Sequence, residues 1–407
     1  MGRKTPEANH RKTRNRIRVR SVFILIYEEV VMKRIILVAL ILCACLVPAA
    51  WGRKMPCPSS VNWTEFHTID MQRYNPCETV LGVSNVGRLR LLGSYATGGP
   101  AESSLAVVDG MLYFGSNDNK VYALDAKTRA LLWSFSTGAP VYSSPAVANG
   151  VVYIGSEDYN VYALNASTGA LLWSYTTGDP VDSSPAVANG VVYIGSDDSN
   201  VYALDAGTGA LLWSYATGNS VNSSPALADG VVYFGSIDGN VYALNASTGA
   251  LLWRDPTGDY VDSSPAVANG VVYIGSINGN VYAVNARTGA LRWTFPAGYP
   301  VDSLPAVANG VVYVGAENHN LYALNASTGA KLWSYQTGNV VWSSSAVANG
   351  VVYFGSFDGN VYALNASTGT KLRSYTTGGA VWSSPTVADG VVYVGSDDGK
   401  MYAFGLK

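Results

Sequence analysis

Short apolar segments, separated by turns rich in Gly, Asn and Asp, recur along the chain from residue 101 onward. The pattern has a period of 40 residues, and units 141–180 and 181–220 are identical at 32 of 40 positions without a gap. Seven full units cover 101–380, and an eighth begins at 381. A repeat of this length indicates an architecture assembled from copies of one small structural unit.

Each unit is predicted to form four short strands, which in the unit 141–180 lie within 143–148, 151–156, 160–166 and 170–178. Asn149-Gly150 separates the first two, and all eight units carry Asn-Gly or Asp-Gly there, which is typical of a type I′ hairpin. Val, Tyr, Ile and Leu occupy both faces of the strands, so each sheet must be covered on both sides. A ring of sheets packed face to face, a β-propeller, meets this requirement.

The segment in front of the repeats supplies the strand that the eighth unit lacks. Residues 91–98 align without a gap with 131–138, the fourth strand of the first unit. Pairing this strand with the last unit closes the ring and removes an open sheet edge. We therefore predict an all-β fold, an eight-bladed β-propeller of four-stranded antiparallel blades, over residues 86–407.

A motif around the third turn of each unit resembles that of a known family. The string Ala163-x-Asn165-x-x-Thr168-Gly169-x-x-x-Trp173 is similar to the tryptophan-docking motif of pyrroloquinoline-quinone-type (PQQ-like) propeller repeats. That superfamily includes the quinoprotein alcohol dehydrogenases and the non-enzymatic lipoproteins of outer-membrane barrel assembly.

The resemblance implies that one tryptophan per blade packs against the following blade. The matching residues are Trp133, Trp173, Trp213, Trp253, Trp293 and Trp333. Arg373 and Gly93 stand at the other two tryptophan positions, and Arg129 breaks the Thr-Gly pair of the first unit. Two blade junctions are therefore predicted to pack differently.

The same turn also contains an N-glycosylation sequon, Asn165-Ala166-Ser167, which recurs at Asn245, Asn325 and Asn365. Sister units carry Asp125 and Asp205 at this position. A side-chain oxygen that bonds the backbone of the turn explains the position equally well.

The head of the chain has the features of an export signal. Lys33 and Arg34 precede an apolar run at 35–51, which ends in small residues, as in a secretory signal peptide. We predict that translation starts at Met32, so that residues 1–31 are not part of the protein. Residues 32–50 are then a signal peptide or a membrane anchor, and residues 51–85 a linker. A lipid anchor within the Cys43–Cys45 stretch is a further alternative. An extracytoplasmic protein is expected, whether secreted, periplasmic or anchored at the cell surface.

Charge and cysteine content refine this expectation. Residues 101–407 hold 22 Asp+Glu and 11 Lys+Arg, and such an acidic body argues against nucleic acid as a partner. Cys57 and Cys77 follow the apolar run and are candidates for a disulfide, although two unpaired thiols fit the sequence nearly as well.

The residues argue against catalysis. The resemblance implies a tricarboxylate quinone held by basic groups, a calcium ion and often two adjacent cysteines. The repeats contain no cysteine, and region 141–253 contains no Lys or Arg. His319 is the single histidine of the repeats, and a lone loop histidine is usually just solvated. We expect no enzyme activity, no PQQ or calcium, and no metal site.

Sequence differences between the units gather at one end of the predicted blades. They concentrate at the second position of each unit, at the turn between strands two and three, and at the unit junctions. The second position precedes the strand that lines the channel of a propeller, so these residues are the predicted ligand site at the channel mouth. They are Glu102, Tyr142, Asp182, Asn222, Asp262, Asp302, Trp342 and Trp382.

An acidic arc beside an aromatic arc suits a peptide, a basic side chain or a sugar. The sequence thus predicts an exported, monomeric, non-enzymatic propeller that binds a protein, peptide or glycan at the cell envelope. A PQQ-dependent dehydrogenase and an envelope assembly factor that resembles the barrel-assembly lipoproteins are the alternatives.

Overall fold

The computed structural model describes Gly2, residues 62–67 and residues 72–406. The chain divides into two units, 1–56 and 57–407. The predicted extension and the signal or anchor segment lie outside the described residues. Among the residues that are described, no helix is long and apolar enough to cross a membrane.

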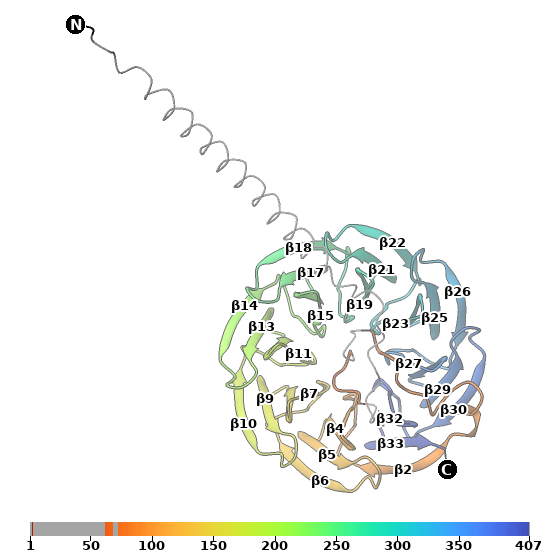
Figure 1. The fold of residues 1–407 in the computed structure, drawn as a ribbon. Helices are drawn as coiled ribbons and strands as arrows, with labels where there is room; N and C mark the ends of the chain where they lie inside the picture. The colour runs from red at the N-terminus through yellow and green to blue at the C-terminus, as the bar shows by residue number, and fades with distance from the viewer. Residues whose placement is uncertain (1, 3–61, 68–71, 407) are drawn as a thin grey trace. The chain divides into compact units, whose positions relative to one another are not determined.

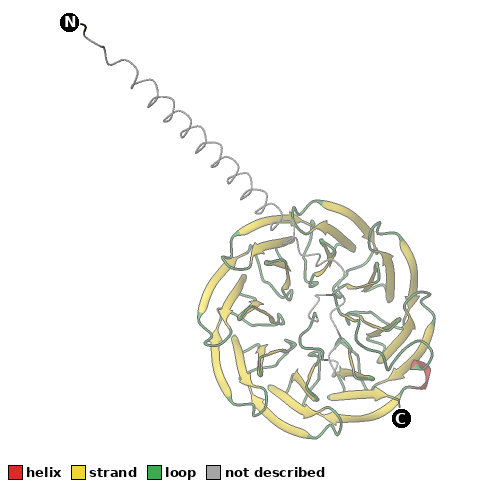
Figure 2. Ribbon diagram, viewed as in Figure 1, coloured by secondary structure: helices red, strands yellow, loops and turns green. Residues whose placement is uncertain are grey.

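Eight sheets of antiparallel strands follow one another around a ring (Figure 1), which confirms the predicted eight-bladed propeller. Strands account for nearly all regular structure of the described residues, and a single 3-10 turn, η1 (Val86–Arg88), precedes the repeats (Figure 2). In every blade the innermost strand has three residues, and three longer strands follow outward; in the eighth blade the outermost of them comes from the front of the chain.

The strands of the first four blades are β3 (Ala106–Val108), β4 (Met111–Ser116), β5 (Lys120–Asp125) and β6 (Leu131–Ser136); β7 (Ala146–Ala148), β8 (Val151–Gly155), β9 (Asn160–Asn165) and β10 (Leu171–Thr176); β11 (Ala186–Ala188), β12 (Val191–Gly195), β13 (Asn200–Asp205) and β14 (Leu211–Ala216); and β15 (Ala226–Ala228), β16 (Val231–Gly235), β17 (Asn240–Asn245) and β18 (Leu251–Pro256).

The strands of the other four blades are β19 (Ala266–Ala268), β20 (Val271–Gly275), β21 (Asn280–Asn285) and β22 (Leu291–Pro296); β23 (Ala306–Ala308), β24 (Val311–Gly315), β25 (Asn320–Asn325) and β26 (Lys331–Gln336); β27 (Ala346–Ala348), β28 (Val351–Gly355), β29 (Asn360–Asn365) and β30 (Lys371–Thr376); and β31 (Thr386–Ala388), β32 (Val391–Ser396) and β33 (Lys400–Gly405), completed by β2 (Arg90–Ala96).

The first hairpin of each blade has the predicted turn chemistry. Asn149 and Gly150 both adopt positive φ angles, of 51° and 76°, as a type I′ turn requires. The equivalent Asn-Gly or Asp-Gly pair does the same in the other seven blades. These turns all lie at one end of the strands, which we call the hairpin face.

Six junctions between blades use the tryptophan of the outer strand. The Nε1 of Trp133 donates to the carbonyl of Ala166 in the next blade at 2.8 Å, and the hydroxyl of Tyr113 donates to the same oxygen. The indole lies directly on Gly169, where an added Cβ would approach it to 2.7 Å. The same contacts repeat for Trp173, Trp213, Trp253, Trp293 and Trp333.

The two junctions of the eighth blade differ, as the sequence predicted. Between blades 8 and 1, Gly93 leaves room for the side chain of Arg129, which donates to the carbonyl of Leu92. At the six tryptophan junctions the outer strand carries the large Trp and the turn of the next blade carries Gly. Here the outer strand carries Gly93 and the turn carries the large Arg129. Between blades 7 and 8, Arg373 lies over the ring of Tyr375, and a small cavity is lined by these two residues and Tyr353.

A second set of contacts joins the blades near the centre of the ring. The backbone N–H of Ser104 donates to Ser144 Oγ at 3.0 Å, and this bond recurs from blade to blade until Ser384 N–H reaches Ser104 Oγ at 2.9 Å. The ladder is interrupted between blades 5 and 6, where Leu304 stands in place of serine. Because the last blade bonds back to the first, the ladder closes the ring from inside.

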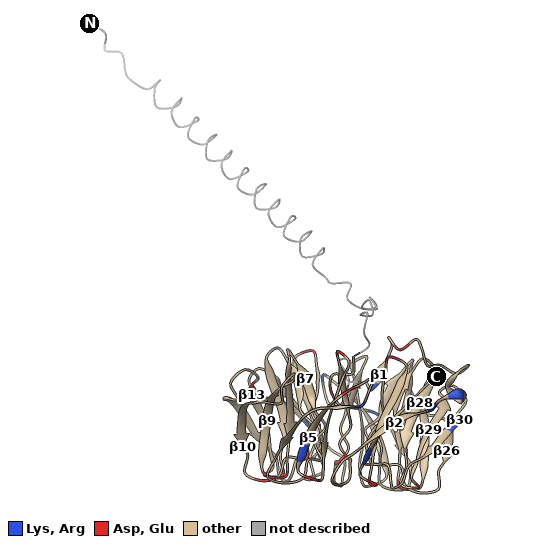
Figure 3. Ribbon diagram, turned by 90° about the horizontal axis from the view of Figure 1, so that it is seen from below, with Lys and Arg blue, Asp and Glu red and all other residues tan. Residues whose placement is uncertain are grey.

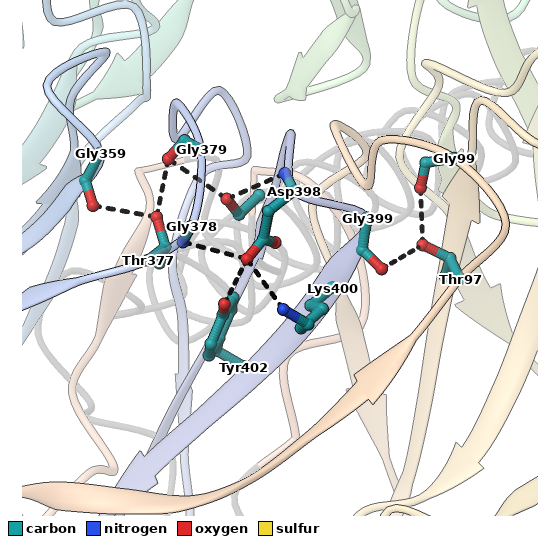
Figure 4. Close-up of polar contacts among 11 residues, drawn as sticks. Thr97, Gly99, Gly359, Thr377, Gly378, Gly379, Asp398, Gly399, Lys400 and Tyr402 are labelled. Atoms are coloured by element: carbon teal, nitrogen blue, oxygen red, sulfur yellow. Dashed lines mark hydrogen bonds and ion pairs between the residues drawn. The ribbon is translucent and has the colours of Figure 1, made fainter.

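A third set ties the blades at the end opposite the hairpin face. The carboxylate of Asp398 accepts hydrogen bonds from the N–H of Gly378 in the preceding blade and from Tyr402 in its own blade (Figure 4). In two blades Asn replaces Asp and turns this arrangement around: Asn278 donates to the carbonyl of Thr257, and the neighbouring Gly258 takes a φ of +93°. The side-chain NH2 of Asn278 is a donor and needs an acceptor, whereas the carboxylate of Asp398 is an acceptor and needs a donor.

The described part of segment 51–85, which was predicted to be a linker, packs inside the ring. Residues 62–67 and 72–78, which we call the inner belt, lie inside the ring against the innermost strands (Figure 1). Trp63 exchanges both backbone hydrogen bonds with Val107, and β1 (Tyr74–Asn75) pairs in parallel with β27. Trp63 and Arg73 are completely buried. Innermost strands have a free edge, and the belt satisfies it.

Candidate functional site at the mouth of the ring

The turns between the second and third strands lie at the same end of the blades as the unit junctions. The N–H of Glu157 donates to the carbonyl of Pro140 at the junction, and the N–H of Asp197 does the same to Pro180. The second position of each unit therefore lies beside the seventeenth position, the first residue of this turn. We call these sixteen residues the mouth.

Around the ring, the second positions are the eight residues predicted from sequence, from Glu102 to Trp382. The seventeenth positions are Asn117, Glu157, Asp197, Ile237, Ile277, Glu317, Phe357 and Asp397. Eight of the sixteen are Asp or Glu, and none is Lys or Arg. Figure 3 shows that acidic residues gather in the turns at the ends of the strands rather than along them.

Burial and mutual repulsion hold several of these carboxyl groups partly protonated near neutral pH. Burial raises the pKa of Asp182 to about 7, and the nearby charges of Asp197 and Glu157 raise it further. Burial also raises the pKa of Asp197 to about 6. Oδ1 of Asp182 and Oδ1 of Asp197 are buried without a hydrogen-bond partner. This part of the mouth therefore holds buried carboxyl groups with no Lys or Arg among the mouth residues to pair with them.

Other carboxyl groups of the mouth also have raised pKa values. Burial raises the pKa of Glu102 to about 7 despite a 2.7 Å hydrogen bond from Asn117. Burial likewise raises the pKa of Asp302 to about 7, assisted by Asp262 and Glu317. Asp262 is exposed to solvent, yet the protein atoms around it raise its pKa through desolvation.

Three aromatic rings occupy the remaining arc. The ring centroid of Trp342 is 4.4 Å from that of Trp382, and Phe357 lies 4.5 Å from both. Trp342 donates from Nε1 to Glu317 at 3.0 Å, and Trp382 hydrogen-bonds Asp397. The side chain of Trp382 is 38% exposed. Trp382 is thus partly exposed beside Asp397 and packed on two further rings.

The structure brings together most of the predicted site residues and adds others. Electrostatic interactions or ring contacts link Glu102, Tyr142, Asp182, Asp262 and Asp302 with one another or with their neighbours at the seventeenth positions. Asn222 shows only a buried Oδ1 without a partner. Phe357, Glu317 and Asp397 were not among the named candidates, although variation at the turn between strands two and three pointed to their position.

The inner belt lies behind the mouth. The guanidinium of Arg73 donates to the carbonyls of Ser345 and Pro385, which lead into the innermost strands, and lies between the rings of Trp63 and Phe66. Cys77, at the end of the belt, is disulfide-bonded, whereas Cys57 lies outside the described residues. No cluster of three or more potential metal ligands occurs in residues 62–67 and 72–406.

Comparisons with known proteins agree with this architecture. A family model for the β-propeller of the beta-alanine-activating enzyme matches residues 152–350, and one for the outer membrane protein assembly factor BamB matches 72–183 and 336–407. The dehydrogenase subunit of a quinone alcohol dehydrogenase from Acetobacter aceti is 42% identical over 73 residues, which are 17% of this chain. The match spans about 10% of that relative's length.

Solved structures show the same fold. BamB from Moraxella catarrhalis is similar with a TM-score of 0.69 and 22% identity, covering 78% of this chain and all of that one. A europium-containing methanol dehydrogenase is similar with a TM-score of 0.73 and 16% identity, covering 85% of this chain and 98% of that one.

The fold and the tryptophan docking together define a class: an eight-bladed β-propeller of four-stranded blades. The chain is similar to PQQ-like β-propellers, as the repeat motif predicted. The residues of the mouth do not fit the anionic quinone implied by the enzymatic branch, because eight carboxyl groups without a Lys or Arg would repel a tricarboxylate.

Proposed function

We propose that this protein is a non-enzymatic binding protein of the cell envelope, and that its mouth docks a positively charged segment of a protein partner. The observation that carries the proposal is the acidic composition of the mouth. The pKa values of these carboxyl groups are raised because desolvation and repulsion destabilise their ionised forms. A cation relieves both, because it stabilises the ionised form of each neighbour.

The aromatic arc supplies the second half of the recognition. An indole face attracts an ammonium or guanidinium group, and Arg in particular stacks on such faces. Trp382 is held by Asp397 and packed on two further rings, so little conformational entropy is lost when a ligand binds. This arrangement favours a basic peptide over a neutral glycan.

Two alternatives retain some support. The local identity with a quinone-dependent dehydrogenase subunit favours an enzyme, but the charge of the mouth opposes the cofactor. The match of residues 72–183 and 336–407 to an outer-membrane assembly factor supports an envelope location and a protein partner. An assembly role would be one form of the binding proposed here.

The test is capture of partners from envelope fractions by the immobilised protein. We expect the double variant Trp342→Ala/Trp382→Ala to lose the captured protein. Tyr299→Ala is the matched control, because Tyr299 is also an exposed aromatic residue (59%) but lies outside the mouth. Equal capture by both variants would contradict the proposal, as would dye-linked alcohol oxidation by the protein supplied with PQQ and calcium.

A further inference from the structure

Described residues of the inner belt accept hydrogen bonds from the innermost strands of blades 1, 2, 3, 6 and 7, in that order. The carbonyl of Trp63 accepts from Val107 in blade 1, the carbonyl of Thr64 accepts from Val147 in blade 2, and Glu65 Oε2 accepts from Val187 in blade 3. Beyond residues 68–71, the order resumes. The carbonyls of Gln72 and Arg73 accept from Val307 in blade 6 and Val347 in blade 7.

Every donor in this series is the central N–H of a three-residue innermost strand. Each innermost strand pairs with the rest of its blade on one side only, and its other edge faces the centre of the ring. The edge therefore offers the same backbone groups in every blade, as sheet edges do in peptide recognition by strand addition. The belt uses these groups as an extended peptide ligand would.

The ring also binds one side chain of the belt, that of Arg73. Arg73 donates from Nε to Ser345 at 2.9 Å, from Nη1 to Phe66 at 2.5 Å and from Nη2 to Pro385 at 2.8 Å, all to carbonyl oxygens. Two of these acceptors belong to adjacent blades. Because the guanidinium is fully buried, loss of these bonds would leave the carbonyls without a partner.

The ring does not depend on the belt for its own closure. The docked tryptophans, the serine ladder and the pairing of β2 with β33 join the blades directly. All four cysteines precede residue 84, so no disulfide connects the belt to the blades. The remaining covalent connection runs through residues 79–89, where Val83 is exposed.

We propose that the edges of the innermost strands form a peptide-binding site distinct from the mouth, that residues 62–67 and 72–78 are its resident ligand, and that the site takes an extended peptide carrying an Arg. The belt is then a bound segment, and its Trp63 packs into the hydrophobic core of the ring. A peptide with the same backbone register and a matching Arg can replace it.

The test starts from the intact chain with a protease recognition sequence inserted between Val83 and Ser84. After cleavage of the folded protein, we expect the N-terminal fragment to dissociate on dilution while the propeller keeps its circular dichroism spectrum. A labelled synthetic peptide of residues 58–82 should then bind saturably, with one peptide per ring.

Two peptide variants make the result specific. Arg73→Ala in the peptide should weaken binding by about 10-fold or more, because it removes hydrogen bonds from a charged donor. Gln72→Ala is the control and should bind like the unchanged peptide, because the belt uses only the carbonyl of Gln72. Unfolding of the propeller when the fragment leaves would overturn the proposal, and so would equal binding of the Arg73→Ala peptide. Neither outcome bears on the mouth.

Discussion

Single residues at the blade junctions show how a repeated motif becomes a packing device. Gly169 serves two purposes: it adopts a φ of +71°, and it lets the indole of Trp133 lie on its Cα. Gly150 has a similar φ of +76° but no heavy atom within 4 Å of an added Cβ. A side chain at Gly150 would add only backbone strain, whereas a side chain at Gly169 would add backbone strain and a clash with the indole.

Replacement of each glycine by alanine should have different costs. Gly150→Ala should lower the free energy of unfolding by about 1–2 kcal/mol, the cost of the left-handed conformation alone. Gly169→Ala should cost clearly more, because its Cβ also displaces the docked indole. Chemical denaturation of both variants measures the difference, and equal losses would show that the indole does not depend on this contact.

The tryptophans should likewise divide into two kinds. Trp173 is buried between blades, so Trp173→Ala should lower the free energy of unfolding by about 3–5 kcal/mol. Trp382 is partly exposed, and most other units carry a small polar or acidic residue at its position, so Trp382→Ala should change stability far less. Thermal melts compare the two; a large loss for Trp382→Ala would mean that the aromatic arc is structural.

At the scale of elements, the sequence was informative wherever units could be compared with one another. The hairpin turns, the docked tryptophans and the completing role of residues 91–98 all followed from alignment of the units, because identical local sequence meets an identical environment in each blade. The side-chain oxygen at Asn165 also accepts hydrogen bonds from Ser167 and Thr168, which accounts for the Asn or Asp of this turn.

The inner belt could not be predicted in this way. It occurs once, so no sister unit marks its pattern, and it binds mainly through backbone groups that leave little trace in side-chain chemistry. No sequence pattern marks Arg73, and only the surrounding carbonyls of the ring explain it. The mouth lies between these cases: its positions were predictable, but its raised pKa values arise from burial and from carboxylates of other units, such as Asp397 and Glu157 near Glu102.

Deletion of the closing strand should be more damaging than deletion of the belt. Removal of 86–98 takes away β2 and leaves β33 with an open edge, whereas removal of 52–80 spares every blade strand. We expect the first deletion to abolish cooperative melting and the second to lower the melting temperature. If the second deletion proved as harmful as the first, closure of the ring would depend on the belt.

At the scale of the whole molecule, the buried carboxyl groups of the acidic mouth make stability depend on pH. The pKa of Asp182 and that of Asp302 are raised by burial from the usual value of 3.8 to about 7. The folded protein therefore holds protons that the unfolded chain releases, and the free energy of unfolding should fall as pH rises from about 4 to about 7. Burial lowers the pKa of His67 from 6.5 to about 3, so between these values the unfolded chain holds a proton that the folded protein lacks. This group therefore makes the free energy of unfolding rise with pH over that range.

Melting temperatures between pH 4 and pH 8 test this dependence, and Asp182→Asn isolates one contribution. The variant should be stabilised relative to the wild type at pH 8 and not at pH 4, because the amide cannot ionise. Parallel curves for the two proteins would contradict the raised pKa.

The central claim, that the mouth binds a cationic segment, is tested most directly by the affinity for a defined basic peptide at two pH values. Calorimetric titration with a blocked peptide of three Arg-Gly repeats should show binding that is tighter at pH 8 than at pH 5.5, because the carboxyl groups with pKa values of about 6 to 7 are ionised only at the higher pH. Trp382→Ala should weaken it, and a peptide with Glu in place of Arg should not bind. Binding that is independent of pH, or equal for the two peptides, would contradict the account.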